Sequence, residues 1–381
     1  MSGPQKIIHA VNQIFKKHPL CNNCLGRLFS KKLRRSSNKL LGKEMNKNQN
    51  FAKKCFICKN LFENLDYFLK LMLNSSSNYS YDTFSIGVIL KPSFIDRDDF
   101  IRSQYKLRGT DGIKTDITRE MAKLFSKKTK KIIDTQKPDV TFTVNLKDDS
   151  VQLRSKSITF AGRYVKTIRG IDQKQKPCVN CSGKGCRMCD FHGISEFESI
   201  EGQISKLLFE KIGGTTAKFT WIGGEDKSSL VLGTGRPFFV KLQNPLKRNL
   251  KLTSFKSNYL KISNFKLVSE SPKQPLKFHS LIQLKISTSS DINSKNLTKL
   301  KILEKHPVVV YRKSGERSEK KIFFIKYKKN SKNIFTLSLK TEGGLPIMKF
   351  IDGNDVIPGI SQILDTTCKC HEFDFKDIEI Q

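Results

Sequence analysis

Two hydrophobic periods alternate along the chain and predict its elements. Residues 84–90 form a short apolar run, and residues 140–146 alternate apolar and polar positions, with Val140, Phe142, Val144 and Leu146 on one face. These two patterns indicate a buried strand and a half-buried strand. Residues 116–133 instead follow a helical period, and we expect this helix to begin at a cap on Asp116.

The second half repeats the mixture on a larger scale. Residues 199–214 carry one apolar stripe made of Ile200, Ile204, Leu207, Leu208 and Ile212, which predicts a helix. From Ala217 onward, short strand-like runs are separated by polar or helical material. This spacing favours an α+β protein with a large mixed, mainly antiparallel sheet and flanking helices.

Composition sets the expected divisions of the chain. Residues 1–70 are basic and helical in pattern, residues 31–54 have the composition of a mobile arm, and residues 74–80 that of a linker. We therefore expect four parts: a Cys-pair zinc-binding segment, an RNA-docking α+β module, a zinc knot and a strand-rich domain, at residues 1–73, 74–175, 176–195 and 196–381.

The charge balance narrows the class of partner. The chain has 70 Lys and Arg residues against 35 Asp and Glu, a formal net charge of +35. Such a charge favours polyanions, because lysines that neutralise phosphates release condensed counterions. The alternative is a solvated surface that only keeps the protein in solution.

Eight of the ten cysteines occur as CxxC pairs, and we expect the pairs to hold zinc. Two pairs flank the Lys-rich and Asn-rich insert, and two follow residue 177 with a short Gly-containing spacer. The two sets are Cys21, Cys24, Cys55 and Cys58, and Cys178, Cys181, Cys186 and Cys189. Two pairs supply four thiolates, the ligand set of a structural zinc site. Cys368 and Cys370, beside His371, are weaker metal candidates.

The sequence shows no pattern typical of a signal peptide or a membrane span. The N-terminal residues lack the apolar run of a signal peptide, and no stretch approaches the ~20 apolar residues of a membrane span. We expect a cytoplasmic protein that needs no membrane and no obligatory protein partner.

A basic and aromatic cluster ends the extended segment after residue 150. It consists of Arg163, Tyr164, Lys166 and Arg169. Cations beside an aromatic ring are typical of RNA-docking surfaces, so we predict that these residues bind RNA. An ordinary small domain with a basic rim is the alternative.

The stretch GGEDKSSLVLGTGRPFFVKLQNP, residues 223–245, places two acids between glycine-rich turns. It resembles the catalytic loop of the archaeal-type tRNA pseudouridine synthases that carry an N-terminal THUMP-containing domain and modify T-arm uridines. The early CxxC pairs, FAGRYVKTIRGI and the C-terminal LKTEGGLPIMKFIDGNDVIPGISQILDTTCKC extend this resemblance over most of the chain.

The resemblance implies a function and named site residues. Asp226 falls on the nucleophile of the family's GRED element, and Arg236 on the arginine of GRPF. The implied activity is isomerisation of uridine 54 and/or 55 of the tRNA T-arm to pseudouridine, without an organic cofactor. An ionised aspartate could attack the sugar or take a proton from it, and the sequence does not choose between these routes.

Three positions depart from the family pattern. Phe278 stands where the family has the tyrosine of K-x-Y, Gly224 where it has the arginine of GRED, and Met348 where it has a lysine. A phenylalanine keeps the ring face that stacks on a base but loses the hydroxyl. We expect Lys349 or Lys340 to pair with Asp226 and keep it ionised.

Two alternatives to the synthase remain, and the three departures motivate the first of them. One is a tRNA-binding protein of the same fold with impaired catalysis. The other is a zinc-stabilised assembly factor for ribonucleoprotein particles. Pseudouridine formation on unmodified tRNA distinguishes the synthase from both alternatives.

Overall fold

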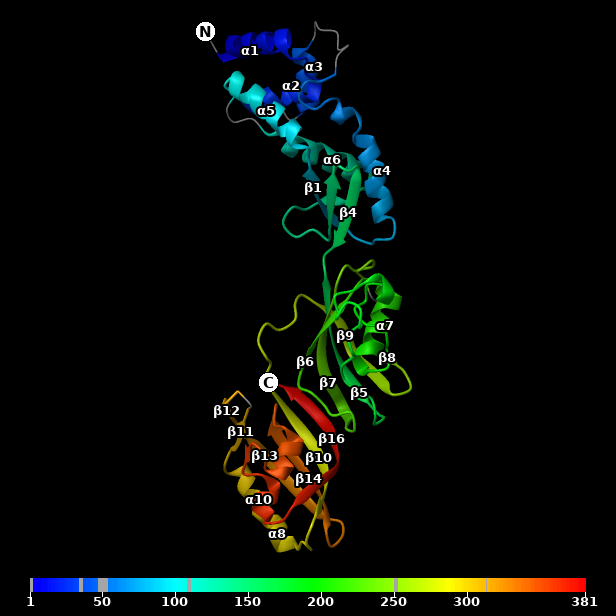
Figure 1. Cartoon of the computed structure of the whole chain (residues 1–381), viewed down its shortest axis with the longest axis vertical. Helices are drawn as coiled ribbons and strands as arrows, with labels where there is room; N and C mark the ends of the chain where they lie inside the picture. The colour runs from blue at the N-terminus through cyan, green and yellow to red at the C-terminus, as the bar shows by residue number, and fades with distance from the viewer. Residues whose placement is uncertain (1–2, 34–36, 47–53, 108–110, 250–252, 313) are drawn as a thin grey trace. The chain divides into compact units, whose positions relative to one another are not determined.

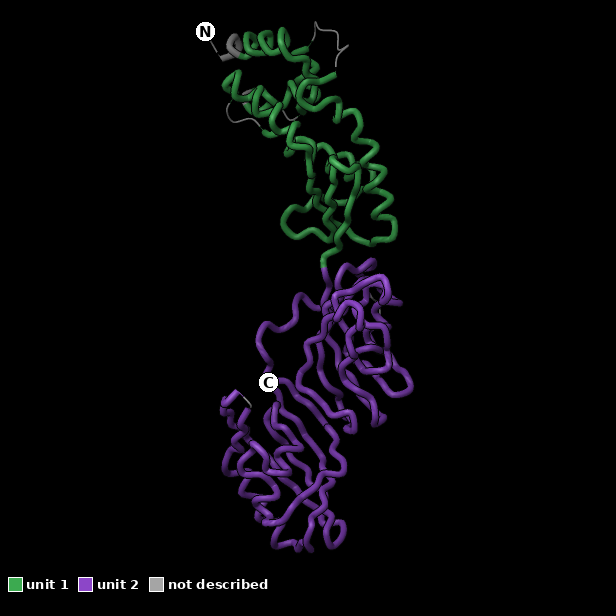
Figure 2. Tube along the Cα trace, viewed as in Figure 1, with its two compact units in different colours: residues 1–156 green, residues 157–381 purple. Residues whose placement is uncertain are grey.

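The alternating segments become strands of two separate sheets in a computed structural model (Figure 1), which describes residues 3–33, 37–46, 54–107, 111–249, 253–312 and 314–381. The chain divides into two units, residues 1–156 and 157–381 (Figure 2). Each unit buries a hydrophobic cluster of its own. The division falls before FAGRYV, so this segment belongs to the second unit, although we expected a boundary at residue 175.

Helices dominate the beginning of the first unit. They are α1 (Gly3–Lys17), α2 (Asn22–Leu33), α3 (Asn38–Met45), the 3-10 turn η1 (Leu61–Glu63) and α4 (Leu65–Ser76). The arm expected at 31–54 is therefore partly helical, and residues 34–36 and 47–53 within it lie outside the described residues. The linker expected at 74–80 is shorter, because α4 continues to Ser76.

A four-stranded sheet completes this unit. Its strands are β1 (Thr83–Ile89), β2 (Ile132–Ile133), β3 (Val140–Asn145) and β4 (Ser150–Ser155), and its helices are α5 (Pro92–Gln104) and α6 (Ile113–Thr129). The order is β2-β1-β3-β4, with β1 parallel to β2 and β3, and β4 antiparallel to β3. The alternation in 140–146 is confirmed, since the apolar side of β3 is buried.

Helix α6 begins earlier than its pattern predicts. Its N-cap is Gly112, and Asp116 lies within the first turn rather than at the cap. The Asp116 carboxylate is fully buried and accepts hydrogen bonds from Asn38 at 2.6 Å and Arg119 at 2.8 Å. Asp116 therefore joins helices of this unit instead of capping one.

The second unit is built on a nine-stranded sheet. The order is β13-β14-β10-β16-β7-β5-β9-β8, and β6 pairs with β7. The strands are β5 (Ile158–Lys166), β6 (Ala217–Trp221), β7 (Leu230–Leu242), β8 (Phe255–Lys256), β9 (Leu260–Val268), β10 (Phe278–Thr288), β13 (Ile322–Lys329), β14 (Ile334–Glu342) and β16 (Cys368–Ile380). Every pairing is antiparallel except that of β16 with β7. The large, mainly antiparallel sheet is thus confirmed.

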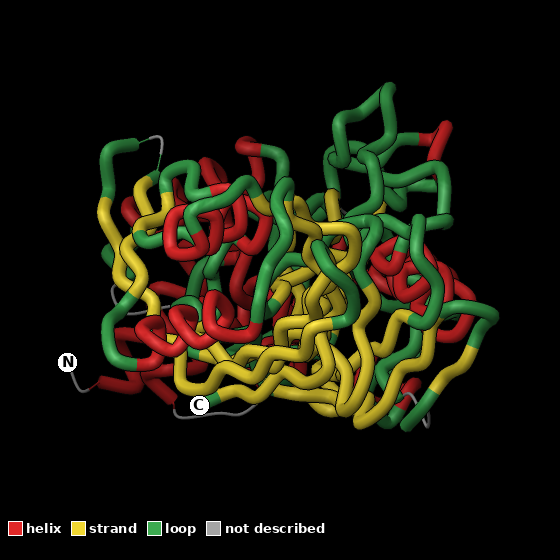
Figure 3. Tube along the Cα trace, turned by 90° about the horizontal axis from the view of Figure 1, so that it is seen from below, coloured by secondary structure: helices red, strands yellow, loops and turns green. Residues whose placement is uncertain are grey.

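Shorter elements complete the second unit; Figure 3 distinguishes helices, strands and loops by colour. They are η2 (Arg187–Cys189), α7 (Ile200–Ile212), α8 (Ser294–Thr298), η3 (Lys299–Glu304), α9 (Ile347–Asp352), α10 (Ile360–Leu364) and the small sheet of β11 (Val308–Tyr311), β12 (Arg317–Lys320) and β15 (Val356–Ile357). The predicted apolar stripe of α7 is buried in the core beside the sheet. The one parallel pairing of this sheet joins Asp374 to Leu230. Leu230 directly follows residues 222–229, the loop that contains Glu225 and Asp226 and is called the acidic loop below.

Candidate active site

The acidic loop connects β6 to β7. Gly223 has φ of 77°, a left-handed conformation that glycine adopts without strain. A Cβ at Gly223 would lie 2.6 Å from Phe278 Cζ and 2.7 Å from Arg236 Nη1. At Gly224 the nearest atom would be Gln173 Oε1, at 3.9 Å. The first glycine is therefore required by its surroundings, whereas the second is not.

Asp226 is exposed at the outer side of this loop. Its Oδ1 accepts hydrogen bonds from the Ser228 hydroxyl at 2.6 Å and the Ser228 backbone N–H at 2.8 Å. These two bonds, and more weakly the charge of Lys166, hold the pKa of Asp226 below its ordinary value of 3.8. Among the described residues, Asp226 Oδ2 makes no hydrogen bond. The site thus presents an ionised carboxylate with one free oxygen.

Glu225, the neighbouring acid, has a side chain with no exposed surface. Its Oε1 lies 3.1 Å from Lys166 Nζ, and its Oε2 lies 3.4 Å from Arg236 Nε. The Tyr164 hydroxyl donates to Oε2 at 2.9 Å. Burial, and then the Glu225 charge, raise the pKa of Tyr164 well above its ordinary value, so Tyr164 remains a donor. Two adjacent acids therefore point to opposite sides of the loop.

A pocket of about 210 Å³ lies beside the loop. Its wall includes Gly223, Gly224, Arg236 and Phe278, together with residues 341–346 at the end of β14 and directly after it. The Phe278 ring is wedged between two glycines, because a Cβ at Gly343 would lie 2.3 Å from its Cε1. The structure thus brings Phe278 and Arg236 to the loop that carries Asp226.

Arg236 is buried but not fully satisfied. Its Nη1 donates to Ile222 O at 2.9 Å, and its guanidinium lies 4.3 Å from the centroid of the Phe375 ring. Its Nη2 has no hydrogen-bond partner among the described residues. Arg236 therefore retains one donor while lining the pocket.

The C-terminal lysines lie elsewhere. Lys349 pairs with Asp355 at 2.7 Å and Lys340 with Glu379 at 2.9 Å, and neither is part of the pocket wall. The expectation that one of them pairs with Asp226 is therefore not met. Lys166 is the lysine whose charge acts on Asp226, and its Nζ donates to the Asp226 carbonyl at 3.1 Å.

Two of the four residues predicted to bind RNA lie in the interior of the second unit, and the other two, Arg163 and Arg169, are partly exposed. Tyr164 and Lys166 are fully buried. Arg163 donates to the carbonyls of Thr234 and Gly235, both at 2.9 Å. Arg169 donates to Ser228 O at 2.6 Å and pairs with Asp374 at 2.7 Å, which fastens the far side of the acidic loop. The sequence pattern predicts an exposed surface, because the sequence of one strand does not show which other strands and loops pack on its side chains.

Sequence reasoning missed Glu225 and Gln173 as residues of the site. Gln173 donates to the Tyr164 hydroxyl at 2.9 Å and to Gly223 O at 3.4 Å. A signal for Glu225 existed: Tyr164 and Lys166 share one face of β5, and a buried lysine there needs an acidic partner. The choice of partner depended on the fold.

Two groups of four cysteines come together as their spacing predicts. Within each group, Cys21, Cys24, Cys55 and Cys58, and Cys178, Cys181, Cys186 and Cys189, the sulfurs all lie within 4.8 Å of one another. The Cys21–Cys58 distance is 3.5 Å and the Cys186–Cys189 distance 3.8 Å, close to the ~3.8 Å edge of a tetrahedron with metal–sulfur bonds of about 2.3 Å. Both groups could hold a metal ion.

Backbone donors stabilise the sulfurs of the second group. The N–H groups of Cys186 and Gly193 donate to Cys189 Sγ, both at 3.3 Å, and that of Gly185 donates to Cys181 Sγ at 3.2 Å. The bond from Cys186 N–H contributes most to lowering the pKa of Cys189 to about 7. These donors favour thiolates, the form that binds metal.

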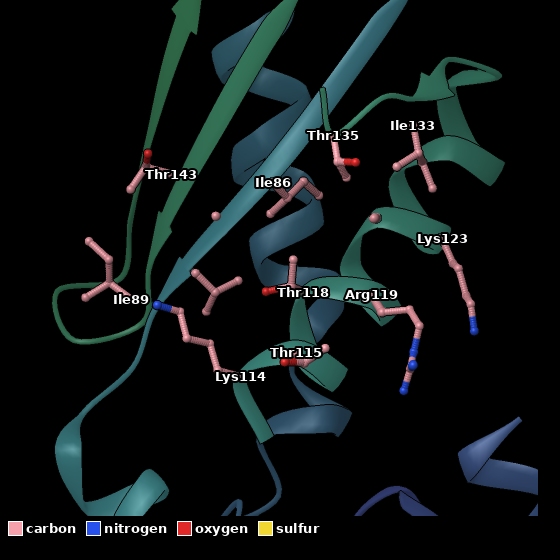
Figure 4. Close-up of a pocket in the computed structure, with 13 residues that line it drawn as sticks. Ile86, Ile89, Lys114, Thr115, Thr118, Arg119, Lys123, Ile133, Thr135 and Thr143 are labelled. Atoms are coloured by element: carbon pink, nitrogen blue, oxygen red, sulfur yellow. The ribbon is translucent and has the colours of Figure 1, made fainter. Parts of the chain in front are cut away.

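The first unit contains a larger groove, of about 720 Å³, between β1 and α6 (Figure 4). Its apolar floor includes Ile86 and Ile133, and α6 contributes Lys114, Arg119 and Lys123. Arg119 and Lys123 pair with acids of their own unit.

In the described part of the chain, no helix is long and apolar enough to span a membrane.

Comparisons with known proteins agree with this architecture. Residues 160–379 match the family described as Pus10, C-terminal, and residues 68–145 match the archaeal Pus10 THUMP domain. The fold and the matches define a THUMP-domain protein whose second unit is of the pseudouridine synthase type. The chain belongs to the Pus10 family.

Relatives match over nearly the whole chain. The tRNA pseudouridine synthase Pus10 of Nitrosopumilus maritimus (strain SCM1) is 63% identical over 100% of both chains. The protein of the same name from Cenarchaeum symbiosum (strain A) is 31% identical over 95% of this chain and 90% of its own. That from Methanosphaera stadtmanae is 28% identical over 96% and 97%.

Proposed function

We propose that this protein converts uridine 54, uridine 55 or both in the tRNA T-arm to pseudouridine, with Asp226 as the nucleophile. The observation that carries the proposal is an ionised, exposed carboxylate on the loop that walls a pocket containing Phe278 and Arg236. Membership of the Pus10 family, whose curated relatives are named tRNA pseudouridine synthases, supports it.

The chemistry needs few parts. The C1′–N1 bond of uridine breaks, the base turns, and a bond forms between C1′ and C5; C5 then loses its proton and N1 gains one, so that the product is an isomer of the substrate. An unprotonated Asp226 oxygen can attack the sugar or accept a proton from it, and Oδ2 is free for either step. The substrate uridine must first leave the T-arm stack.

The pocket supplies a place for the loosened base. The Phe278 ring offers an apolar wall, and we assign it the contact with the uracil ring. Arg236 Nη2 has no partner in the described structure but is buried, so we assign Arg236 to the wall of the pocket, where its charge faces the base site. Lys340 and Lys349 keep no role in this proposal, because Glu379 of β16 pairs with Lys340 and Asp355, just after α9, pairs with Lys349.

The decisive experiment compares Asp226→Asn with the native protein on an unmodified tRNA transcript. We expect the variant to lose pseudouridine formation by at least about 10³-fold while binding tRNA within a few-fold. Asp291→Asn changes an exposed aspartate far along the chain and should leave the rate unchanged. Full activity of Asp226→Asn would refute the nucleophile assignment.

Transcripts with cytidine at 54, at 55 or at both positions identify the substrate position. Product that disappears with one substitution assigns that uridine. Tight tRNA binding without product in the native protein would favour a catalytically impaired member of the family. Equal affinity for ribosomal RNA fragments would favour an assembly factor.

Both cysteine groups belong to the proposal as structural zinc sites. Four thiolates at tetrahedral spacing are the usual zinc ligand set. When bound, zinc would cross-link each loop and take no part in the isomerisation.

A further inference from the structure

Glu225 is the buried acid next to the exposed Asp226, and its environment differs from that of an ordinary structural ion pair. One carboxylate faces two cations, Lys166 and Arg236, and all three side chains have no exposed surface. Tyr164 adds a hydroxyl donor at 2.9 Å. Four buried polar side chains therefore converge directly behind the acidic loop.

The same partners also hold the loop backbone. Arg236 donates to Ile222 O at 2.9 Å, and Lys166 donates to Asp226 O at 3.1 Å. Gln173, which reaches Glu225 through the Tyr164 hydroxyl, donates to Gly223 O at 3.4 Å. Three carbonyls, on both sides of Glu225, are thus fixed by side chains that its carboxylate gathers.

We propose that Glu225 is a positioning residue for the reaction: its carboxylate assembles the donors that fix the loop and so aim Asp226 at the sugar. This inference rests on the proposed role of Asp226. Without the Glu225 charge, Lys166 and Arg236 are two buried cations that repel each other. This repulsion weakens the hydrogen bond from Lys166 to the Asp226 carbonyl, and the loop loses one of the contacts that fix its backbone.

Glu225→Gln tests the proposal, since it keeps the size of the side chain and removes its charge. We expect the single-turnover rate of pseudouridine formation to fall roughly 100-fold, the loss typical of a misplaced reacting group, with the tRNA Kd changed less than about threefold. The rate is measured at saturating protein, well below the melting temperature.

Asp98→Asn is the matched control in the first unit. Asp98 is equally buried and is paired with the fully buried Arg27. Its substitution should lower the melting temperature and leave the rate per folded molecule within about twofold. If Glu225→Gln lowers the rate no more than Asp98→Asn does, Glu225 only stabilises the fold and the proposal is wrong.

The double variant Lys166→Met, Glu225→Gln separates charge balance from positioning. It removes one charge of each sign, so the melting temperature should recover towards the native value. The rate should not recover, because the Asp226 carbonyl has lost its donor. If the melting temperature and the rate both recover, Glu225 only balances the charge of Lys166, and the proposal is wrong.

Hydrogen exchange keeps this inference distinct from the function on which it rests. Amide exchange of residues 223–229 should accelerate in Glu225→Gln and not in Asp98→Asn, whether or not the native protein forms pseudouridine. An inactive native protein would refute the proposed function alone. Unchanged exchange of the loop would refute the positioning role.

Discussion

At the scale of single residues, two adjacent glycines of the acidic loop have opposite requirements. Gly223 has positive φ and no space for a Cβ, whereas Gly224 has an ordinary φ and an open neighbourhood. The family motif has arginine at the position of Gly224, and a Cβ there would meet no atom closer than 3.9 Å. The backbone at this position therefore accepts a residue other than glycine.

Gly223→Ala should lower the free energy of unfolding by about 1–3 kcal/mol, because it combines backbone strain with displacement of the Phe278 ring. Gly224→Ala should change it by less than about 0.5 kcal/mol. Trp221, the single tryptophan of the chain, lies at the start of this loop and reports urea unfolding of the second unit by fluorescence. Equal destabilisation by both substitutions would contradict the geometry.

Ser228→Ala should move the acidic limb of the pH–rate profile to higher pH. The hydroxyl of Ser228 favours the charged form of Asp226, so its removal raises the pKa of Asp226 towards the ordinary 3.8. The native contribution of this carboxylate to stability is full above 3.8 and is lost as pH falls through the lower folded-state pKa. Ser331→Ala, on an exposed turn, should leave the profile unchanged.

The residues of the site differ in how far sequence reveals them. Asp226, Arg236 and Phe278 stand out because short motifs carry them, and the structure places Asp226 on the loop and Arg236 and Phe278 in the wall of the pocket beside it. Lys349 and Lys340 are candidates because the family has a lysine near Met348, but Asp355 and Glu379 pair with them instead. Glu225 was passed over, because burial of one of two adjacent acids depends on strands distant in sequence.

At the scale of elements, the cysteine loop of residues 178–193 has little regular structure, and its single short helix is η2. Metal removal should therefore unfold this loop, since metal-binding energy is folding energy in such segments. We expect two zinc ions per chain in reduced protein and one in Cys178→Ser, with a lower melting temperature in the variant. Cys370→Ser, outside both groups, should keep both ions. Elemental analysis without zinc in fresh protein would refute the assignment.

Element periods are predicted better than element ends. The helical stripe of α7 and the alternation of β3 follow directly from burial on one face. The sequence predicts Asp116 at a helix start, where aspartate is common, but it lies buried inside α6, where Asn38 of α3 and Arg119 of the same helix donate to it. The polar run after residue 73 was read as a linker, although its first residues finish α4. The preference of a residue for a helix end or a linker therefore predicts its position poorly where contacts in the folded unit satisfy its polar groups.

At the scale of the whole molecule, charge and unit boundaries carry different amounts of information. The net charge of +35 is a property of composition and needs no fold. The boundary at 156/157 could not be predicted, because β5 follows β4 with almost no intervening residues yet pairs with β7 and β9 of the other unit. Strand pairing, rather than a change in composition, divides this chain.

The central place of β16 affects the order of events during synthesis. This strand follows every other described strand in the chain, yet it lies between β10 and β7 and contributes Phe375 to the pocket wall. Until β16 has been synthesised, the two antiparallel halves of the sheet therefore have no shared neighbour. Nascent second units remain incomplete, with two open edges, until residues 368–380 leave the exit tunnel.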